Sequence, residues 1–145
     1  MTAHIKRFED LEAWQLSREL TNQIYEITKR ESICRDFSFV DQLRKAAIFT
    51  MNNIAEGFER GSNKDFVKFL FIARGSAGEV RSLLYLGLDQ AYLSNSEFEE
   101  GRALCIRCCQ VIWGLIRSLR SKSGWITGMK IFLTGIALRF GLGYL

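Results

Sequence analysis

The sequence predicts an all-α fold, an antiparallel up-down four-helix bundle. Apolar residues recur at three- and four-residue spacing in four stretches of roughly 20–28 residues, which is the period of an amphipathic helix. The connections are mostly short, and none of the 145 residues is proline. Long helices joined by short connections pack as neighbours in an up-down bundle, and a chain of this length forms one domain.

The first two helices are predicted over residues 10–30 and 39–60. The core stripe of the first consists of Ala13, Leu16, Leu20, Ile24 and Ile27, with Trp14 beside it. The core stripe of the second consists of Leu43, Ala47, Thr50, Ile54 and Phe58. Residues 31–36 break the pattern and fit a loop, and Gly61 is placed to end the second helix.

The third helix follows Ser62, which with Asp65 resembles a capping box. Its core seam consists of Phe66, Leu70, Ala73, Ala77, Val80, Leu84 and Ala91. A second stripe beside the seam consists of Val67, Phe71, Arg74, Gly78, Arg81 and Tyr85. Because a helix with so little polar surface is buried on more than one side, we expect another subunit to cover this stripe and the protein to be an oligomer.

Glycines inside these helices indicate close packing. Gly57, Gly75 and Gly78 each cost roughly 1 kcal/mol relative to alanine in a helix. We therefore expect another backbone to approach at these positions.

The fourth helix has the clearest start signal. Ser94 and Glu97 form a full capping box, and Leu93 and Phe98 are spaced as a hydrophobic staple. The core stripe that follows consists of Phe98, Cys105, Cys108, Ile112, Leu115 and Leu119. The helix is predicted to end near Arg120, where Arg117 and Arg120 complement the helix dipole.

The chain divides into a bundle, residues 1–120, and an atypical Gly-rich apolar C-terminal extension, residues 121–145. The longest apolar run of the extension, Ile131–Leu138, is far shorter than the roughly 20 residues that span a bilayer, so membrane insertion is not expected. The alternatives for the extension are a loosely packed appendage or a contact element. Four cysteines without an N-terminal apolar segment indicate a reducing, cytoplasmic location.

The net charge of +4 is a weak argument for a nucleic-acid partner. Lys122, Lys130 and Arg139 lie in the extension, which has no acidic residue, so residues 1–120 are nearly balanced. Only a local cluster of basic residues could bind phosphates.

Five motifs resemble the bacterial four-helix-bundle proteins encoded in intervening sequences of large-subunit ribosomal RNA genes. These motifs are FEDLEAWQ (8–15), QLRKAA (42–47), NNIAEGFER (52–60), KDFVKFLFIARGS (64–76) and LIRSL (115–119). The resemblance implies a homopentameric ring and no settled activity. A related group serves as accessory subunits of diversity-generating reverse transcriptases and binds nucleic acid. The extension departs from the family pattern.

Neither catalysis nor a metal site is expected. The one histidine, His4, lies near the N-terminus, and no P-loop, dinucleotide-binding or HExxH motif is present. Cys105, Cys108 and Cys109 lack a fourth soft ligand at a suitable spacing, so core packing is the favoured interpretation. The sequence therefore predicts a protein that is not an enzyme and has neither a cofactor nor a small-molecule substrate.

Two groups of polar residues are candidate sites. A buried network between the second and third helices would fix their register or contact a ligand; its members are Asn53, Glu56, Arg74, Ser76 and Glu79. A basic surface would bind RNA or DNA, or would be a solvated mixed-charge surface; its members are Arg44, Lys45, Arg60, Lys64, Lys68 and Arg81. The leading hypothesis is a ring that binds nucleic acid through repeated basic patches. The alternative is an assembly module for a protein partner, such as a reverse transcriptase, without nucleic-acid contact.

Overall fold

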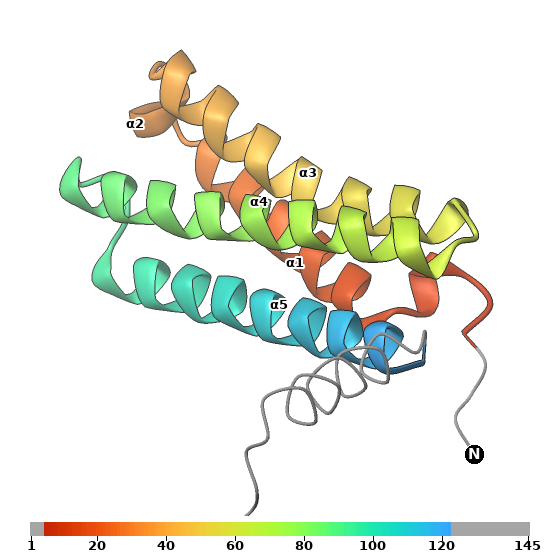
Figure 1. Ribbon diagram of the computed structural model, residues 1–145. Coiled ribbons are helices and arrows are strands. Elements are labelled where there is room, and N and C mark those ends of the chain that lie inside the picture. The colour runs from red at the N-terminus through yellow and green to blue at the C-terminus, as the bar shows by residue number, and fades with distance from the viewer. Residues whose placement is uncertain (1–4, 123–145) are drawn as a thin grey trace, which may run out of the picture.

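The computed structural model describes residues 5–122, and all the elements in that range are helical (Figure 1). In chain order they are η1 (Phe8–Asp10), α1 (Glu12–Thr28), α2 (Glu31–Cys34), α3 (Phe37–Glu59), α4 (Asn63–Asp89) and α5 (Asn95–Lys122). The predicted all-α fold class is confirmed for this range. The extension predicted from residue 121 lies outside the described residues, apart from positions 121 and 122, which end α5.

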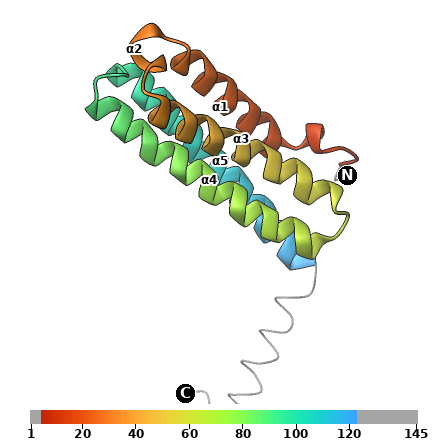
Figure 2. The ribbon, with the colours of Figure 1, turned by 90° about the horizontal axis from the view of Figure 1, so that it is seen from above.

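The four long helices surround a common core (Figure 2). α1 packs against α3 and α5, and α4 packs against the same two helices, so α1 and α4 occupy diagonal positions. Fully buried side chains such as Leu20, Leu43, Leu84 and Ile112 fill the space between them. Burying a side chain of this size contributes roughly 1.5–3 kcal/mol, which makes the core the main source of stability.

The connection between α1 and α3 differs from the predicted loop because residues 31–34 form α2. Ile33 in this turn is fully buried and packs into the core, so the turn is anchored. Asp36 then accepts a hydrogen bond from the backbone N–H of Phe39 at 3.1 Å. This N-cap makes α3 begin at Phe37, two residues earlier than predicted.

The predicted capping box of the last helix is confirmed. The Ser94 hydroxyl accepts from the Glu97 N–H at 3.2 Å, and the Glu97 carboxylate accepts from the Ser94 N–H at 2.9 Å. Arg30 also binds this carboxylate, and these contacts lower the pKa of Glu97 to about 2. Leu93 and Phe98 are both buried, as a hydrophobic staple requires.

The turn between α3 and α4 contains Gly61 with a φ of +67°, a conformation that glycine adopts without strain. Ser62 accepts from the Asp65 N–H at 3.4 Å and so caps α4. Beyond the turn, α3 and α4 approach closely at Gly57, where a Cβ atom would lie 2.5 Å from Cβ of Phe69. The expected close approach is therefore confirmed at Gly57.

Gly75 and Gly78 behave differently, because a Cβ atom at either position would meet no atom of the described residues within 4 Å. The packing within the subunit does not require glycine at these two positions.

Candidate nucleic-acid interface

Three of the six predicted basic residues are paired with acids on their own helices. Lys45 lies 2.7 Å from Asp41, and Lys68 lies 3.1 Å from Asp65. Arg60 lies 2.7 Å from Glu56. Exposed pairs of this kind contribute little to stability, but they reduce the positive potential that a phosphate would meet.

The other three basic residues point to different parts of the surface. Arg44 contacts α1, where its Nε donates to Thr28 Oγ1 at 2.8 Å. Lys64 and Arg81 are exposed and form no ion pair with any residue in the described range. The binding of these six residues to nucleic acid stays a prediction.

The predicted buried polar network is not formed within residues 5–122. Arg74 is exposed and lies over the Trp113 ring, 4.8 Å from its centroid, while Glu56 pairs with Arg60. Asn53 donates to the Phe49 carbonyl at 2.7 Å. Ser76 is buried, whereas Glu79 is exposed. Within the isolated subunit Arg74 lies on the side of α4 that faces α5, where it contacts Trp113, so the network stays a prediction.

α5 covers part of the second apolar stripe of α4, for which we expected another subunit. Phe71 packs edge-on against Trp113 with ring centroids 6.2 Å apart, and Tyr85 packs against Phe98 at 4.7 Å. The covering is incomplete, because Phe71 is 41% and Tyr85 is 50% exposed.

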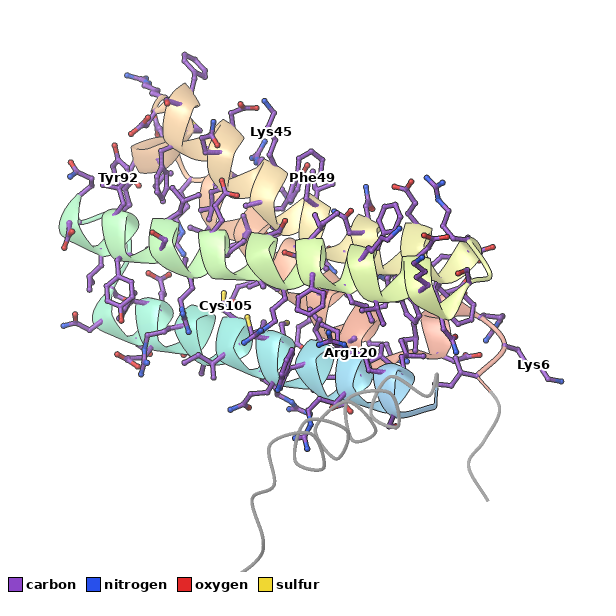
Figure 3. The ribbon with its side chains drawn as sticks, in the orientation of Figure 1. Lys6, Lys45, Phe49, Tyr92, Cys105 and Arg120 are labelled. Atoms are coloured by element: carbon purple, nitrogen blue, oxygen red, sulfur yellow. The ribbon has the colours of Figure 1, made fainter. Side chains whose placement is uncertain are left out.

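These contacts bring arginine and aromatic side chains of α4 and α5 together on one side of the bundle, where Figure 3 labels Arg120 of α5. We call this surface the arginine–aromatic face, and it consists of Phe71, Arg74, Arg81, Tyr85, Trp113 and Arg120. Arg120 lies 5.7 Å from the Phe71 centroid, and Arg74 covers Trp113. Arg81 lies close enough to the α5 thiols Cys105 and Cys109 to lower the pKa of each, an effect that burial outweighs.

Acidic residues are scarce around this face. Between residues 66 and 88 the only acid is Glu79, two positions before Arg81, a spacing that turns the two side chains apart on a helix. α5 has no acidic residue after Glu100. Phosphates would therefore meet guanidinium groups there with little competing negative charge.

Sequence reasoning missed Trp113 as a site residue and treated Arg120 only as a partner of the helix dipole. One signal was present: residues 101–122 contain four arginines and no acid. The sequence could not show that this helix lies beside the Arg74 and Arg81 side of α4.

The cysteines of α5 are part of the core, as predicted. Cys105 and Cys108 are fully buried, and burial raises the pKa of each thiol to about 12. No group of three or more potential metal-ligating side chains occurs within residues 5–122. In the same range, no helix is both long and apolar enough to cross a membrane.

The described residues form a small all-helical bundle. The family model described as 23S rRNA-intervening sequence protein matches residues 9–114. A protein of unknown function from the S23 ribosomal protein family of Bacteroides thetaiotaomicron has a similar crystal structure. The match has a TM-score of 0.66 and 21% identity, and it covers 72% of this chain and 97% of that one. No curated protein matches.

The chain therefore belongs to the 23S rRNA-intervening sequence protein family, since the match covers most of its length. This confirms the resemblance carried by the five motifs. The structural similarity, at 21% identity, supports the fold alone.

Proposed function

We propose that this protein is a non-enzymatic helical scaffold that associates with RNA or DNA through the arginine–aromatic face. Its subunit is an antiparallel up-down bundle, and subunits assemble into a homo-oligomeric ring, a pentamer as the family resemblance implies. The observation that carries the proposal is the gathering of three arginines and three aromatic rings on one face with few acids nearby.

The chemistry of this face suits a single strand. Guanidinium groups bind phosphates, and aromatic rings stack with bases without regard to sequence. Arg74 and Arg120 already lie over rings, so part of the ordering that binding requires is present beforehand. One subunit offers few contacts, but a ring repeats the face and raises the affinity through multivalency.

A matched pair of double variants tests the proposal. Arg74→Ala/Arg81→Ala and Lys64→Ala/Lys68→Ala each remove two positive charges from α4, so their net charges are equal. We expect the first variant to weaken binding of a single-stranded oligonucleotide by roughly tenfold or more, and the second to have a smaller effect. If the lysine variant loses more affinity, the arginine–aromatic face is not the interface.

The alternative function is a protein–protein assembly module, and the outer surface of α3 and α4 favours it. Phe49 and Ile72 are 55% and 53% exposed, and Leu86 is also exposed. Ile72, Glu79 and Leu86 recur every seven residues, a spacing typical of helix–helix contacts. Gly75 on the same helix leaves room for close approach. This surface could hold a second subunit or a reverse transcriptase.

Size measurement tests the role of this outer surface. Ile72→Asp should lower the oligomer mass in light scattering while leaving the helical circular dichroism signal intact, because Ile72 contributes little to the core. Loss of assembly together with retained nucleic-acid binding would separate the two functions. An unchanged mass would show that subunits meet elsewhere.

A further inference from the structure

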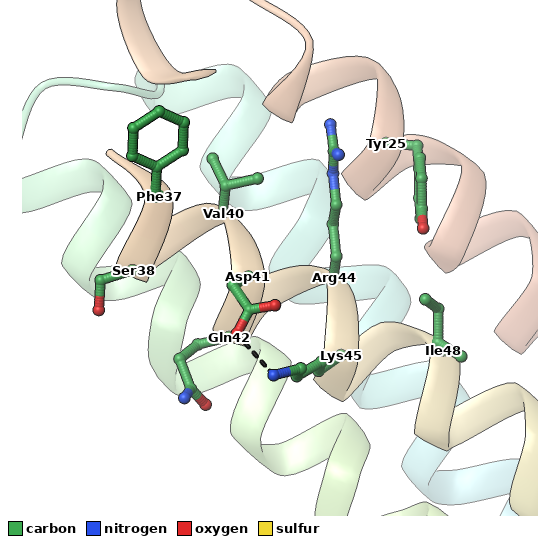
Figure 4. Close-up of a pocket in the computed structure, with 9 residues that line it drawn as sticks. All are labelled: Tyr25, Phe37, Ser38, Val40, Asp41, Gln42, Arg44, Lys45 and Ile48. Atoms are coloured by element: carbon green, nitrogen blue, oxygen red, sulfur yellow. Dashed lines mark hydrogen bonds and ion pairs between the residues drawn. The ribbon is translucent and has the colours of Figure 1, made fainter. Parts of the chain in front are cut away.

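A second candidate site lies between α1 and α3, at the end of the bundle near α2. A shallow surface depression, largely open to solvent, lies there. It is lined by Tyr25, Phe37, Ser38, Val40, Asp41, Gln42, Arg44, Lys45 and Ile48 (Figure 4).

Arg44 is the central charged group of the pocket. It is half-buried, its Nε donates to the Thr28 hydroxyl at 2.8 Å, and its guanidinium lies 4.6 Å from the Tyr25 centroid. Both contacts are with neutral groups, and Arg44 has no ion pair with any acid between residues 5 and 122. The planar group is thus held in place without a counter-ion, and its terminal N–H donors form the fork that binds phosphate or carboxylate.

Phe37 provides an exposed aromatic surface about two helical turns from this arginine on α3. It is 79% exposed and is the first residue of α3, where the Asp36 cap holds the backbone in place. Figure 4 shows Phe37, Val40 and Arg44 projecting from the same side of α3. A ligand that places an anionic group on Arg44 would therefore lie close to an open ring.

The remaining charges of the pocket neutralise each other, because Lys45 lies 2.7 Å from Asp41. The uncompensated charge is that of Arg44. An acidic peptide would need several cations in the pocket to bind well. A ligand with one phosphate and one flat ring needs only one guanidinium and one exposed aromatic ring, which Arg44 and Phe37 provide.

We propose that the α1–α3 pocket binds one nucleotide unit, with its phosphate on Arg44 and its base against Phe37. The unit could be a free nucleotide or one residue of a strand, since both present the same chemistry. The choice of a nucleotide as the ligand rests on the proposed function, whereas the pocket itself does not. The pocket itself is separate from the arginine–aromatic face, because the α1–α3 side of the bundle lies opposite the α4–α5 side.

The test is titration calorimetry of the full chain with AMP, with inorganic phosphate and with a ten-nucleotide single-stranded RNA. Phe37→Ala and Arg44→Gln should each weaken binding of AMP or of the oligonucleotide by roughly tenfold. The control Asn52→Ala removes an exposed side chain from the same helix, outside both the pocket and the assembly surface, and should change the binding of neither ligand. Thermal melting shows whether Arg44→Gln remains folded, and Phe37→Ala provides an independent test because its side chain is exposed.

Each outcome decides between the alternatives. Binding of AMP that depends on Phe37 and Arg44 supports a free-nucleotide site, and dependence seen only with the oligonucleotide supports a strand contact. If neither ligand is affected by the two variants, or if phosphate alone binds as tightly as AMP, the pocket proposal is overturned. Loss of binding in Arg74→Ala/Arg81→Ala alone would leave the proposed function standing without the pocket.

Discussion

Replacing Gly57 by alanine tests the packing of α3 against α4. The added Cβ would lie 2.5 Å from Phe69 Cβ and 3.0 Å from Phe66 Cδ2. Phe69 Cβ is fixed to the backbone of α4, so no rotamer change relieves the first contact. The two helices have to separate, and overpacking of this kind costs roughly 1–3 kcal/mol.

The helix propensity of alanine offsets part of that cost by about 1 kcal/mol. We therefore expect Gly57→Ala to destabilise the subunit by a net of up to roughly 2 kcal/mol. Gly114→Ala is the control, because the same methyl group on α5 would meet no atom of the described residues within 4 Å. That variant should be more stable than the native chain by about 1 kcal/mol.

Urea unfolding followed by circular dichroism measures both changes under the same conditions. The two variants should differ in unfolding free energy by roughly 1–3 kcal/mol, with Gly114→Ala the more stable of the two. If Gly57→Ala is stabilising, as in an isolated helix, the close approach of α3 and α4 at this position is wrong.

Three further predictions concern single side chains. The pKa of Glu97 is lowered from its ordinary value of 4.5 to about 2. The contribution of Glu97 to folding stability should therefore be complete above pH 4.5 and should be lost as the pH falls from 4.5 toward 2. Glu97→Gln should cost about 1 kcal/mol at pH 7, after allowance for solvent screening, and less at pH 3, as urea titrations at both pH values would show. Burial raises the pKa of Cys105 and of Cys108 to about 12, so both thiols should resist a thiol reagent at pH 8 in the folded protein. For the same reason, the free energy of unfolding should fall under alkaline conditions. Arg74→Ala should lower stability by only about 0.5–1 kcal/mol, since it loses a cation–π contact at an exposed site; a loss of several kcal/mol on melting would show that a buried partner exists.

The helices were predictable because their signals are local. Ser94 and Glu97 form their cap within one turn, and Gly61 ends α3 through its own backbone conformation. The periodic apolar positions likewise identify the core. Leu20 and Leu84 each belong to an apolar stripe along one helix face, and such a stripe is buried whichever helix packs against it.

The candidate site was less predictable because it depends on which helix lies beside which. The second stripe of α4 was visible in the sequence, but its aromatic partners Trp113 and Phe98 come from α5. The predicted basic patch depended on the number of basic residues in the second and third helices, not on their positions in the fold. The charges of Lys45, Arg60 and Lys68 are offset by acids three or four residues away, as in the Lys68–Asp65 pair.

The salt dependence of binding tests the central claim most directly. The logarithm of the association constant for a single-stranded RNA should fall linearly with the logarithm of salt concentration, with a slope of about 0.7 per phosphate contact. We expect the slope of Arg74→Ala/Arg81→Ala to be smaller than that of the native chain by at least about 1.4, the value for two lost contacts. The equally charged Lys64→Ala/Lys68→Ala variant should keep a slope closer to the native one. Equal slopes for the native chain and the arginine variant would contradict the assignment of the arginine–aromatic face as the nucleic-acid interface.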